Sequence, residues 1–590
     1  MIVKMKKITI LTSEKDASHT VGSLRKLGLL HINSMQLPQA DYITSIEHRL
    51  NGVNKAMAIL GDAEQKDQEL EKKTLVSYEK EILSLGEQRQ NYKSSLAESE
   101  KKLLWFKEWG DVCQHSLEDL EEAGIFLKVY TCNIAAFKNI DKAKNIFIVK
   151  QVKKDLCIAL VSRNKDESLD FPQIEIPQES RHNLEKKVAS ANSHLKGINK
   201  RLLGLSVYKS AFSKYKDKLL KDLEFANVRF GMAHKEGISC LQGFCPEESV
   251  EKINKQAKQH GWALISQDPD NPEEVPTLIK TPKWLKMVNP VFKFMGTVPG
   301  YNEFDVSFWF LTFFSLFFAM LIGDAGYGLV FLGLTIFARK KAKSAPPEPF
   351  ALMYVLSIST LIWGAITGTW FGFEKIAQSP LFNSMVIDKI NSFSSTNQDF
   401  MMYICFIIGA VHLTIAHGFI ALADIKSPRS LSQVGWISII WGLFFLAGNL
   451  VLARPLPGIA NWLLLGGVAL VLVFSNPQKN ILKGILTSLG DLPLKIISSF
   501  SDVVSYLRLF AVGYASVVVA ASFNEMALSG GINSIVGGLI AAFILFLGHA
   551  LNVVLGLMAV IVHGIRLNML EFSGHLDMQW SGREYQPFKE

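Results

Sequence analysis

Residues 501–515, SDVVSYLRLFAVGYA, and residues 549–566, HALNVVLGLMAVIVHGIR, decide the fold of this chain. Each segment places one arginine, Arg508 or Arg566, deep inside an apolar stretch of about 40 residues. An unpaired guanidinium inside a bilayer costs about 3 kcal/mol on insertion scales, so intramembrane arginines mark functional sites, most often for ion or proton movement. The two segments therefore predict membrane helices with a transport role.

Charge divides the chain near residue 300. Of the 590 residues, 1–300 hold 46 Lys and Arg against 39 Asp and Glu, whereas 301–590 hold 16 against 15. Dense charge is typical of a soluble domain, and sparse charge of a membrane domain. The start, MIVKMKKITILTSEK, has no long apolar core and predicts a strand rather than a signal peptide. We therefore expect the first half to lie in the cytoplasm.

Several functional classes lack their sequence signals. The small positive excess of the first half is not clustered with aromatic residues, which argues against nucleic acid as a partner. No GxxxxGK[ST] phosphate loop occurs, so we expect a non-catalytic chain without nucleotide hydrolysis or a cofactor. Only Cys240 and Cys245 of the six cysteines are close together, without a second pair to complete a zinc site. We expect reduced, structural cysteines and no metal.

The first half predicts an elongated α/β dumbbell. Strand, helix, strand patterns at both of its ends predict a proximal lobe made from residues 1–45 and 228–280. Charged segments at 46–120 and 180–227 predict helices that pair as an antiparallel coiled coil, because neither apolar stripe can be buried alone. Their stripes comprise Leu70, Leu75, Tyr78, Ile82 and Leu85, and Leu184, Val188, Leu195, Ile198 and Leu202.

Between the two helical segments, three strand-like runs predict a distal lobe at 121–179. The runs are IFLKVYTCNI, NIFIVKQVKK and LCIALVSR. We expect residues 1–300 to form a spacer or docking arm; a plain solvated helical surface is the alternative.

Residues 301–590 predict an α-helical polytopic domain with about eight transmembrane helices. The apolar stretches lie at about 306–322, 325–338, 350–371, 401–422, 434–453, 459–474, 486–527 and 534–572. A perpendicular span needs about 20 residues, so the last two stretches must be tilted or extend beyond the bilayer. The first two are short and flank a glycine-rich break at 323–328, which allows a hairpin. A single span remains the alternative there.

Loop charge favours both termini in the cytoplasm. The loops after spans two, four and six carry eight cations, Arg339, Lys340, Lys341, Lys343, Lys426, Arg429, Lys479 and Lys483. The external loops carry three, Lys375, Lys389 and Arg454. Counting the first two spans as one would invert this bias, which favours eight spans.

Each arginine belongs to a stripe of small and polar residues that follow one another at helical spacing. One stripe comprises Ser498, Ser501, Ser505, Arg508, Ala515 and Ser522, and the other His549, Asn552, Gly556, Ala559, His563 and Arg566. Asp502 and Glu571 are six and five residues from the nearest arginine, outside the spacing of same-helix ion pairs. Pairing between helices, with Asp502, Glu525 or Glu571, stays open. We expect the counter-charge to lie on another protein.

Spans three and four hold residues with a simpler explanation. Gly364, Gly368 and Gly372 lie at the four-residue spacing that suits close helix packing. His412 and His417 are five apart, about 140° around a helix, so they do not share a face as metal ligands would. We interpret both histidines as packing or cavity residues.

The chain resembles the membrane stator subunit, called a or I, of V-type and A/V-type rotary ATPases, over its whole length and in the same order of parts. The specific signals are SDVVSYLRLFAVGYA and the segment GHALNVVLGLMAVIVHGIRLNMLEFSGHL. Further matching segments are VPTLIKTPKW, LIGDAGYG and a closing YQPF. The chain is shorter than typical relatives, which suits a compact form in a prokaryotic cell membrane.

The resemblance implies a mechanism. In relatives, the two long helices face a rotating proteolipid ring, and the arginines matching Arg508 and Arg566 oppose the ring's ion-carrying carboxylates. A ring carboxylate facing lipid is neutral, whereas opposite a guanidinium its charged form is favoured and the ion is released. Two offset half-channels then make rotation carry protons or sodium ions across the membrane, in the direction of pumping or of ATP synthesis. The N-terminal arm would bind peripheral stalks and, through them, the ATP-hydrolysing head.

Half-channel candidates are Glu525, His549, Asn552, His563, Ser505 and Ser501. In many eukaryotic relatives a carboxylate lies ten residues before the second arginine, where this chain has Gly556. This departure leaves the route of proton access open, and Glu525 is a possible functional substitute.

Two other functional classes compete. A self-contained secondary transporter or channel with a regulatory coil would enclose a substrate site in its own spans, often with internal repeats, and we find none between these spans. A membrane-anchored scaffold would explain the coil but not the two intramembrane arginines.

Overall fold

The computed structural model describes residues 1–590 apart from 62–71, 112–113, 134–136, 138–144, 153–154, 175, 178, 344, 395–396, 477–480 and 530–534. Leu70, Cys113 and Lys479, used in the sequence predictions, lie outside the described residues. The chain divides into two compact units. The membrane unit comprises Met1–Leu11, Leu24–Asn33 and Gln242–Lys589, and the arm unit comprises Thr12–Ser23, Ser34–Leu241 and Glu590.

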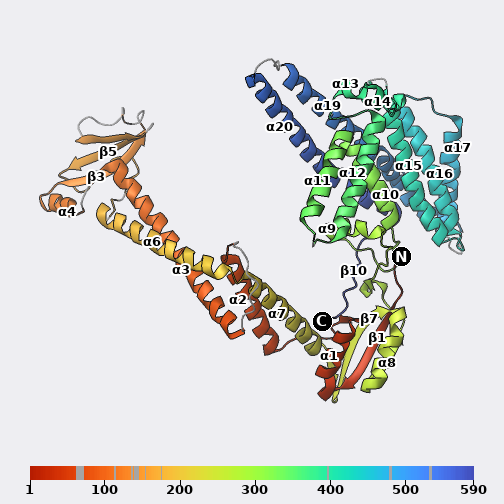
Figure 1. The fold of residues 1–590 in the computed structure, drawn as a ribbon, viewed down its shortest axis with the longest axis horizontal. Helices are drawn as coiled ribbons and strands as arrows, with labels where there is room; N and C mark the ends of the chain where they lie inside the picture. The colour runs from red at the N-terminus through yellow and green to blue at the C-terminus, as the bar shows by residue number, and fades with distance from the viewer. Residues whose placement is uncertain are drawn as a thin grey trace. The chain divides into compact units, whose positions relative to one another are not determined.

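Two pairs of helices form most of the arm unit. Helix α2 (Asp41–Ile59) packs along α7 (Lys209–Phe230), and α3 (Lys72–Trp109) packs along α6 (Arg181–Ser206) (Figure 1). Few glycines and many charged residues of high helix propensity sustain these helices, while apolar residues at three and four spacing form the buried seam.

Aromatic pairs fix the direction of α3 against α6. Tyr78 stacks on Tyr208 and Tyr92 stacks on His194, so the partner number falls as the number along α3 rises. The two helices are therefore antiparallel. Ile82, which is fully buried, belongs to the apolar core that they share.

A three-stranded antiparallel sheet follows α3 in the arm unit. Its order is β3 (Phe126–Asn133), β5 (Asp155–Ser162) and β4 (Ile146–Val152), next to the short helix α4 (Gln114–Glu122). The central strand β5 is buried from Leu156 to Leu160, as expected for a strand with neighbours on both sides. The edge strand β4 instead exposes apolar side chains, Phe147, Ile148 and Val149.

A second sheet contains both early and late strands. Its order is β2 (His31–Asn33), β7 (Ile238–Pro246), β1 (Met5–Ser13) and β8 (Ala263–Gln267), and β6 (Ala233–Lys235) also pairs with β7. Helices α1 (Ala17–Leu27) and α8 (Val250–His260) connect strands along the chain. Four of the five strands match the predicted runs, and β6 was not predicted. Burial alternates along β1, and β7 is largely buried, whereas β2, β6 and β8 have no buried residue.

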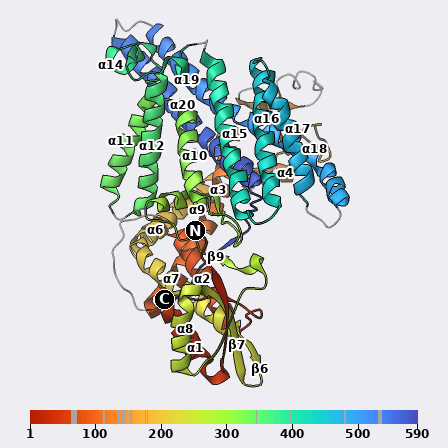
Figure 2. The same cartoon turned by 90° about the vertical axis from the view of Figure 1, so that its right-hand side faces the viewer.

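The membrane unit is predominantly helical. Its helices are α9 (Asn289–Met295), α10 (Ser307–Ile322), α11 (Ala325–Lys341), α12 (Pro347–Thr367), α13 (Glu374–Ala377), α14 (Pro380–Asn383), α15 (Gln398–Ala423), α16 (Arg429–Leu452), α17 (Gly458–Phe474), α18 (Ile481–Ser505), α19 (Leu507–Ser529), α20 (Ile535–Ala559) and α21 (Ser573–His575). Figure 2 shows α15, α16, α17 and α18 next to one another.

Five helical segments among the described residues are long and apolar enough to cross a bilayer. The pair α10 and α11 passes the same test together but bends by 119°, so one continuous helix is excluded there. Helix α17 is apolar but shorter, with 17 residues. The structure therefore offers five to six candidate spans by this test.

The last two spans have the predicted abnormal length. They cover Ser488–Ser529 (42 residues) and Ile535–His575 (41 residues). Figure 1 shows α19 and α20 running obliquely past α11 and α12. Neither span is a uniform α-helix, because the first breaks at Tyr506 and the second contains π-helical segments at Val560–Gly564 and Leu567–Phe572.

A buried carboxylate holds the hairpin between α10 and α11. Asp324 caps α11 by accepting hydrogen bonds from the backbone N–H groups of Gly326 (2.8 Å) and Tyr327 (3.2 Å). It also accepts from the N–H groups of Phe371 and Gly372, both at 2.9 Å. Because four donors satisfy its oxygens, Asp324 can be 2% exposed and still fasten the hairpin to the loop after α12.

Of the three glycines predicted to pack helices, only Gly364 does so within a helix. A Cβ there would lie 2.1 Å from the backbone nitrogen of Ala325. Helix α12 ends at Thr367, so Gly368 and Gly372 are not on it; both have positive φ, at +77° and +67°. Glycine adopts this backbone conformation without the Cβ clash that other residues meet. Gly368 ends α12, whereas Gly372, from a loop, does allow a close approach to a helix, since a Cβ there would lie 2.6 Å from Ala520 Cβ on α19.

The closing YQPF segment returns to the second sheet within the membrane unit. Strand β10 (Arg583–Glu584) pairs in parallel with β9 (Pro276–Thr277). Farther on, the Tyr585 hydroxyl donates to Leu29 O at 2.7 Å, and the Phe588 N–H donates to Leu30 O at 2.9 Å. The segment after the last span is therefore hydrogen-bonded to the residues just before β2, the edge strand of the second sheet.

We predict that Gly364→Ala destabilises the purified full-length chain in detergent by about 1–3 kcal/mol, because the added methyl group meets backbone rather than a movable side chain. Gly333→Ala in α11 is the matched control, since nothing lies within 4 Å of its Cβ position. Alanine there should be neutral or stabilising, because it favours the helix. Thermal unfolding measures both, and equal midpoints for Gly364→Ala and wild type would contradict the prediction.

Candidate functional site

Arg508 lies one residue after a break between α18 and α19. At the break, the Leu509 N–H bonds to Tyr506 O, three residues back, and the Tyr506 N–H bonds to Val503 O. The Ser505 carbonyl is available to a side chain, and it accepts a hydrogen bond from Arg508 Nε at 2.9 Å. The break therefore bends the guanidinium back toward the preceding helix and fixes its direction.

Tyr506 holds this break in place. Its side chain is fully buried, and its hydroxyl lies 2.8 Å from Nδ1 of His412 on α15. Gly409, one turn earlier on α15, leaves the space for the ring, since a Cβ there would lie 2.7 Å from a ring carbon. His412 stacks between Phe313 and Phe572, so the hydroxyl bonds to an immobilised imidazole. As predicted, His412 is a packing residue.

Arg566 lies between the two π-helical segments of the last span. In a π-helix the backbone hydrogen bonds join residues i and i+5, so residues five apart are brought onto one face. Glu571 is five residues after Arg566, and its Oε1 lies 3.6 Å from Arg566 Nε. The same oxygen lies 2.5 Å from Arg508 Nη2.

One buried glutamate therefore joins both arginines. The Glu571 side chain is 3% exposed, against 23% for Arg508 and 55% for Arg566. Its second oxygen, Oε2, is buried and has no hydrogen-bond partner among the residues that the structure describes. The cluster carries two positive charges and one negative charge.

The expectation that the arginines lack a partner within the chain is wrong. It rested on α-helical spacing, in which residues five apart do not form ion pairs, and the π-helical segment changes that spacing. The pairing of Arg508 is the interhelical one that the sequence left open, with Glu571 as the partner. Asp502 contacts His575 instead, and Glu525 is exposed on α19.

A polar cavity of about 620 Å³ reaches this cluster. Arg566, Glu571, Asp502 and His575 line it, together with Asp424 from the loop after α15. The cavity also contains a chain of side-chain hydrogen bonds from α16 to α18. Gln433 Oε1 lies 2.7 Å from His417 Nδ1, His417 Nε2 lies 2.9 Å from His575 Nδ1, and His575 Nε2 lies 3.1 Å from Asp502 Oδ2. His417 is thus a cavity residue, as predicted.

A second polar chain joins α11, α19 and α20. Asn552 Nδ2 donates to the Tyr327 hydroxyl at 3.0 Å, and that hydroxyl lies 2.8 Å from His549 Nδ1. His549 Nε2 lies 3.1 Å from Asn524 Oδ1. Asn552 is held by a further bond from its Nδ2 to Ser516 O at 2.9 Å. Two predicted residues, His549 and Asn552, therefore meet at a tyrosine from the α10–α11 hairpin.

The other predicted residues are more dispersed. Ser501 is exposed on α18, and Ser505 contributes its backbone carbonyl to Arg508. His563 lies in the first π-helical segment, with a buried Nδ1 that has no hydrogen-bond partner among the described residues. At Gly556 a Cβ would lie 2.8 Å from Ile322 Cδ1, so α10 occupies the space that a carboxylate side chain would need.

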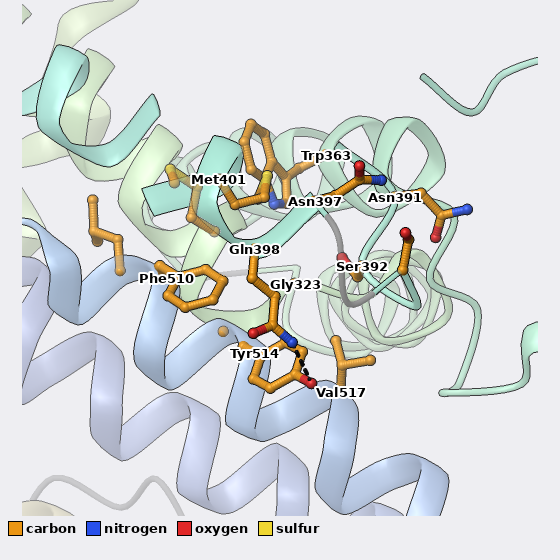
Figure 3. A pocket seen from close by; sticks show the side chains of 14 residues that line it. Gly323, Trp363, Asn391, Ser392, Asn397, Gln398, Met401, Phe510, Tyr514 and Val517 are labelled. Carbon is orange, nitrogen blue, oxygen red and sulfur yellow. Dashed lines mark hydrogen bonds between the residues drawn. The ribbon is translucent and has the colours of Figure 1, made fainter. Parts of the chain in front are cut away.

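A smaller cavity of about 30 Å³, room for one or two water molecules, lies on the other side of α19. Asn391, Asn397 and Gln398 line it, and Gln398 Nε2 donates to the Tyr514 hydroxyl at 2.9 Å (Figure 3). Gly323 and Gly513 allow α10 and α19 to approach closely beneath it. This cavity does not include either arginine.

Sequence reasoning missed Glu571 as the central residue, and it missed Tyr506, Tyr327 and His575. The signal for Glu571 was present, since it was one of three acidic candidates for an interhelical pair. Tyr327 lies 222 residues from His549, and His575 lies 158 residues from His417 and 73 from Asp502, so only the fold brings them together.

Comparison of the sequence with known proteins identifies the family of this chain. No protein-family model matches the sequence. V-type ATP synthase subunit I of Borreliella burgdorferi is 34% identical and V-type ATP synthase subunit I 1 of Treponema pallidum is 27% identical, each over 100% of this chain and 100% of the relative. A-type ATP synthase subunit I of Methanocaldococcus jannaschii is 25% identical over 75% of this chain and 68% of the relative.

This chain therefore aligns from end to end with a V-type ATP synthase subunit I. It also contains the two arginines, the buried glutamate that contacts both, and the candidate membrane spans. The chain belongs to the family of subunit I of V-type and A-type ATP synthases, a non-catalytic membrane stator subunit of a rotary ATPase.

Proposed function

We propose that this chain forms the two ion half-channels against a rotating proteolipid ring, and thereby couples ATP hydrolysis or synthesis to proton or sodium transport. Eight segments cross the membrane, including the short helices α10, α11 and α17, and both termini lie in the cytoplasm of a prokaryotic cell. The observation that carries the proposal is the sharing of one buried glutamate by Arg508 and Arg566.

The charge of this cluster supports a role toward an external anion. Two guanidinium groups share a single carboxylate, so one positive charge is left uncompensated within the cluster. The more exposed guanidinium is that of Arg566. A ring carboxylate arriving there would complete the charge balance, and the attraction would favour its ionised form and release of its ion. Arg508, bound to Ser505 O and Glu571, holds the inner side of the same cluster.

An unpacked apolar surface leads to this point. The last span leaves a series of large side chains exposed, namely Leu539, Phe543, Phe546, Leu551, Val554, Leu555 and Met558 on α20 and Val562 in the first π-helical segment. Val562 is one turn before Arg566 on the exposed side of the span. Such a surface is stable against lipid or another membrane helix, and a ring of helices could slide along it without polar contacts to break.

Each half-channel has a polar route in the chain. The inner route is the cavity lined by Asp502, His575 and Glu571, which includes Asp424 near the cationic loop predicted to face the cytoplasm. The outer route follows Asn552, Tyr327 and His549 along the interface of α19 and α20. The inner route touches Arg566 and Glu571, whereas the outer route lies before Arg566 along the last span, so the guanidinium groups would stand between the two routes and block direct leakage.

Two features of the arm unit suit a role in docking peripheral stalks. Its helix pairs provide a long spacer, and among the described residues β4 is an edge strand with exposed Phe147, Ile148 and Val149. An exposed apolar edge strand is a template for association with another chain. We place one stalk contact at this edge, through which the arm would resist torque from the ATP-hydrolysing head.

We expect the complete ATPase complex with Arg508→Ala to assemble but to lose ATP-driven ion transport, because the inner cation that opposes the ring carboxylates is gone. Ion uptake into proteoliposomes measures this loss, alongside ATP hydrolysis. Full transport by the Arg508→Ala complex would contradict the assignment.

A double variant controls for stability. Removing Arg508 alone weakens the compensation of a buried carboxylate, and breaking a buried pair commonly costs about 3–5 kcal/mol. Arg508→Ala with Glu571→Gln removes both charges, and it should regain the thermal stability that the single variant loses without regaining transport. If the double variant transports ions at the wild-type rate, Arg508 acts only through stability.

For the stalk contact, we predict that Phe147→Asp lowers copurification of the peripheral stalks by roughly tenfold or more, since burying a phenylalanine stabilises a contact by about 1.5–3 kcal/mol. Leu203→Asp on α6 is the matched control, because Leu203 and Phe147 are equally exposed, at 61% and 60%. Stalk content is measured in affinity-purified complexes. Equal losses in both variants would place the contact elsewhere.

A further inference from the structure

The chain Gln433–His417–His575–Asp502 in the inner cavity has an unusual count of donors and acceptors. With the Gln433 oxygen facing His417, Nδ1 of His417 must carry a proton, so in neutral His417 the other nitrogen, Nε2, is an acceptor. Nδ1 of His575 must then donate to it. A neutral His575 would therefore present an acceptor, Nε2, to Asp502 Oδ2.

Two acceptors 3.1 Å apart need one additional proton between them. That proton can be carried by His575 as an imidazolium or by Asp502 as a carboxylic acid. A second arrangement avoids it, if the Gln433 amide turns so that its nitrogen donates to His417. Every later bond in the chain then reverses its direction, and His575 Nε2–H donates to an ionised Asp502.

The two arrangements thus differ by one proton and by the direction of every bond in the chain. The outer chain differs, because Asn552 donates to Tyr327, Tyr327 to His549, and His549 to Asn524 with a neutral imidazole throughout. A proton added to His549 would turn Tyr327 from a donor into an acceptor and take away the acceptor of its buried O–H, whereas the inner chain gains or loses a proton with a donor and an acceptor at each of its bonds.

The position of the inner chain suits exchange with water. The Asp502 side chain is 26% exposed and lines the cavity, whereas the His575 side chain is 9% exposed. The cavity continues to Glu571, whose buried Oε2 has no partner among the described residues. Other charged residues line the cavity together with His575 and Asp502. They are Lys495, which is on the same helix as Asp502, and Arg429, Asp424, Asp577, Arg566 and Glu571 from other elements.

We propose that His575 and Asp502 form a proton-holding site of the inner half-channel, with His417 and Gln433 fixing its tautomer, so that the transported ion is a proton. This proposal rests on the proposed function, whose half-channel it describes in more detail. His575 and Asp502 act on the moving proton itself, whereas His417 and Gln433 are positioning residues.

The transfer is balanced without any other reactant. A hydronium ion in the cavity gives its proton to an Asp502 oxygen, and water is left. While the Gln433 oxygen faces His417, His575 Nε2 has no proton of its own, so the proton passes to it from Asp502 as the carboxylate re-forms. Release reverses these steps toward cavity water or a ring carboxylate, and only O–H and N–H bonds break and form.

Asp502→Asn tests the site in the complete ATPase complex. The amide nitrogen can donate to His575 Nε2, so the hydrogen-bonded chain is kept without the extra proton. We expect ATP-driven proton uptake into proteoliposomes to fall roughly tenfold at about pH 8 outside and much less at about pH 6. The stronger effect at high pH follows because cavity water then supplies fewer protons. Asp502→Glu, which keeps a carboxylate, should restore transport.

Asp491→Asn is the matched control, with the same chemical change on the same helix at an exposed position outside the cavity. Wild-type transport by Asp502→Asn at both pH values, or equal loss in Asp491→Asn, overturns the proposal. So does sodium uptake with no proton uptake by the wild-type complex. In each of these outcomes, loss of transport in Arg508→Ala still supports the half-channel function, so the two ideas fail separately.

Discussion

The contact of Glu571 Oε1 with both arginines is the interaction on which the membrane unit depends. It allows two cations from different helices to lie close together in an apolar region, where each alone would be costly. It also fixes α18 and α19 relative to the last span. Because a single carboxylate serves two guanidinium groups, the cluster keeps an excess of one positive charge, and this excess makes it suited to meet the carboxylates of another subunit.

Departures from regular helix geometry make that contact possible. The break at Tyr506 frees the Ser505 carbonyl and turns Arg508, and the π-helical segment after Arg566 brings Glu571 onto its face. The break at Tyr506 is supported from outside its own helix, by His412 and by the space at Gly409.

The inner polar chain, from Gln433 to Asp502, and the outer polar chain, from Asn552 to Asn524, suit different roles, proton exchange and rigid packing. The outer chain is satisfied with neutral side chains and holds α20 against the hairpin anchored by Asp324. The inner chain lies in an open cavity and can change its proton content. Burial explains the difference, because Asn552 is enclosed by three helices whereas Asp502 faces the cavity. A rigid interface on one side and an exchangeable site on the other fit a stator that must hold its shape while ions pass.

The sequence by itself determined that one half of the chain is charged and the other apolar, and it determined most strands of the two small sheets, the paired arm helices and the two over-long spans. These features follow from local periodicity and charge, whereas the short strand β6 was not predicted. It also singled out both arginines, since a charge in an apolar stretch is visible without a fold. Only the tertiary structure decided their partner. The contact of Arg508 with Glu571 spans 63 residues, and that of Arg566 needs a π-helical turn, which side-chain spacing in an α-helix does not anticipate. The partners of His417 and Tyr327 likewise depend on which helices pack together, a long-range property that no single segment encodes.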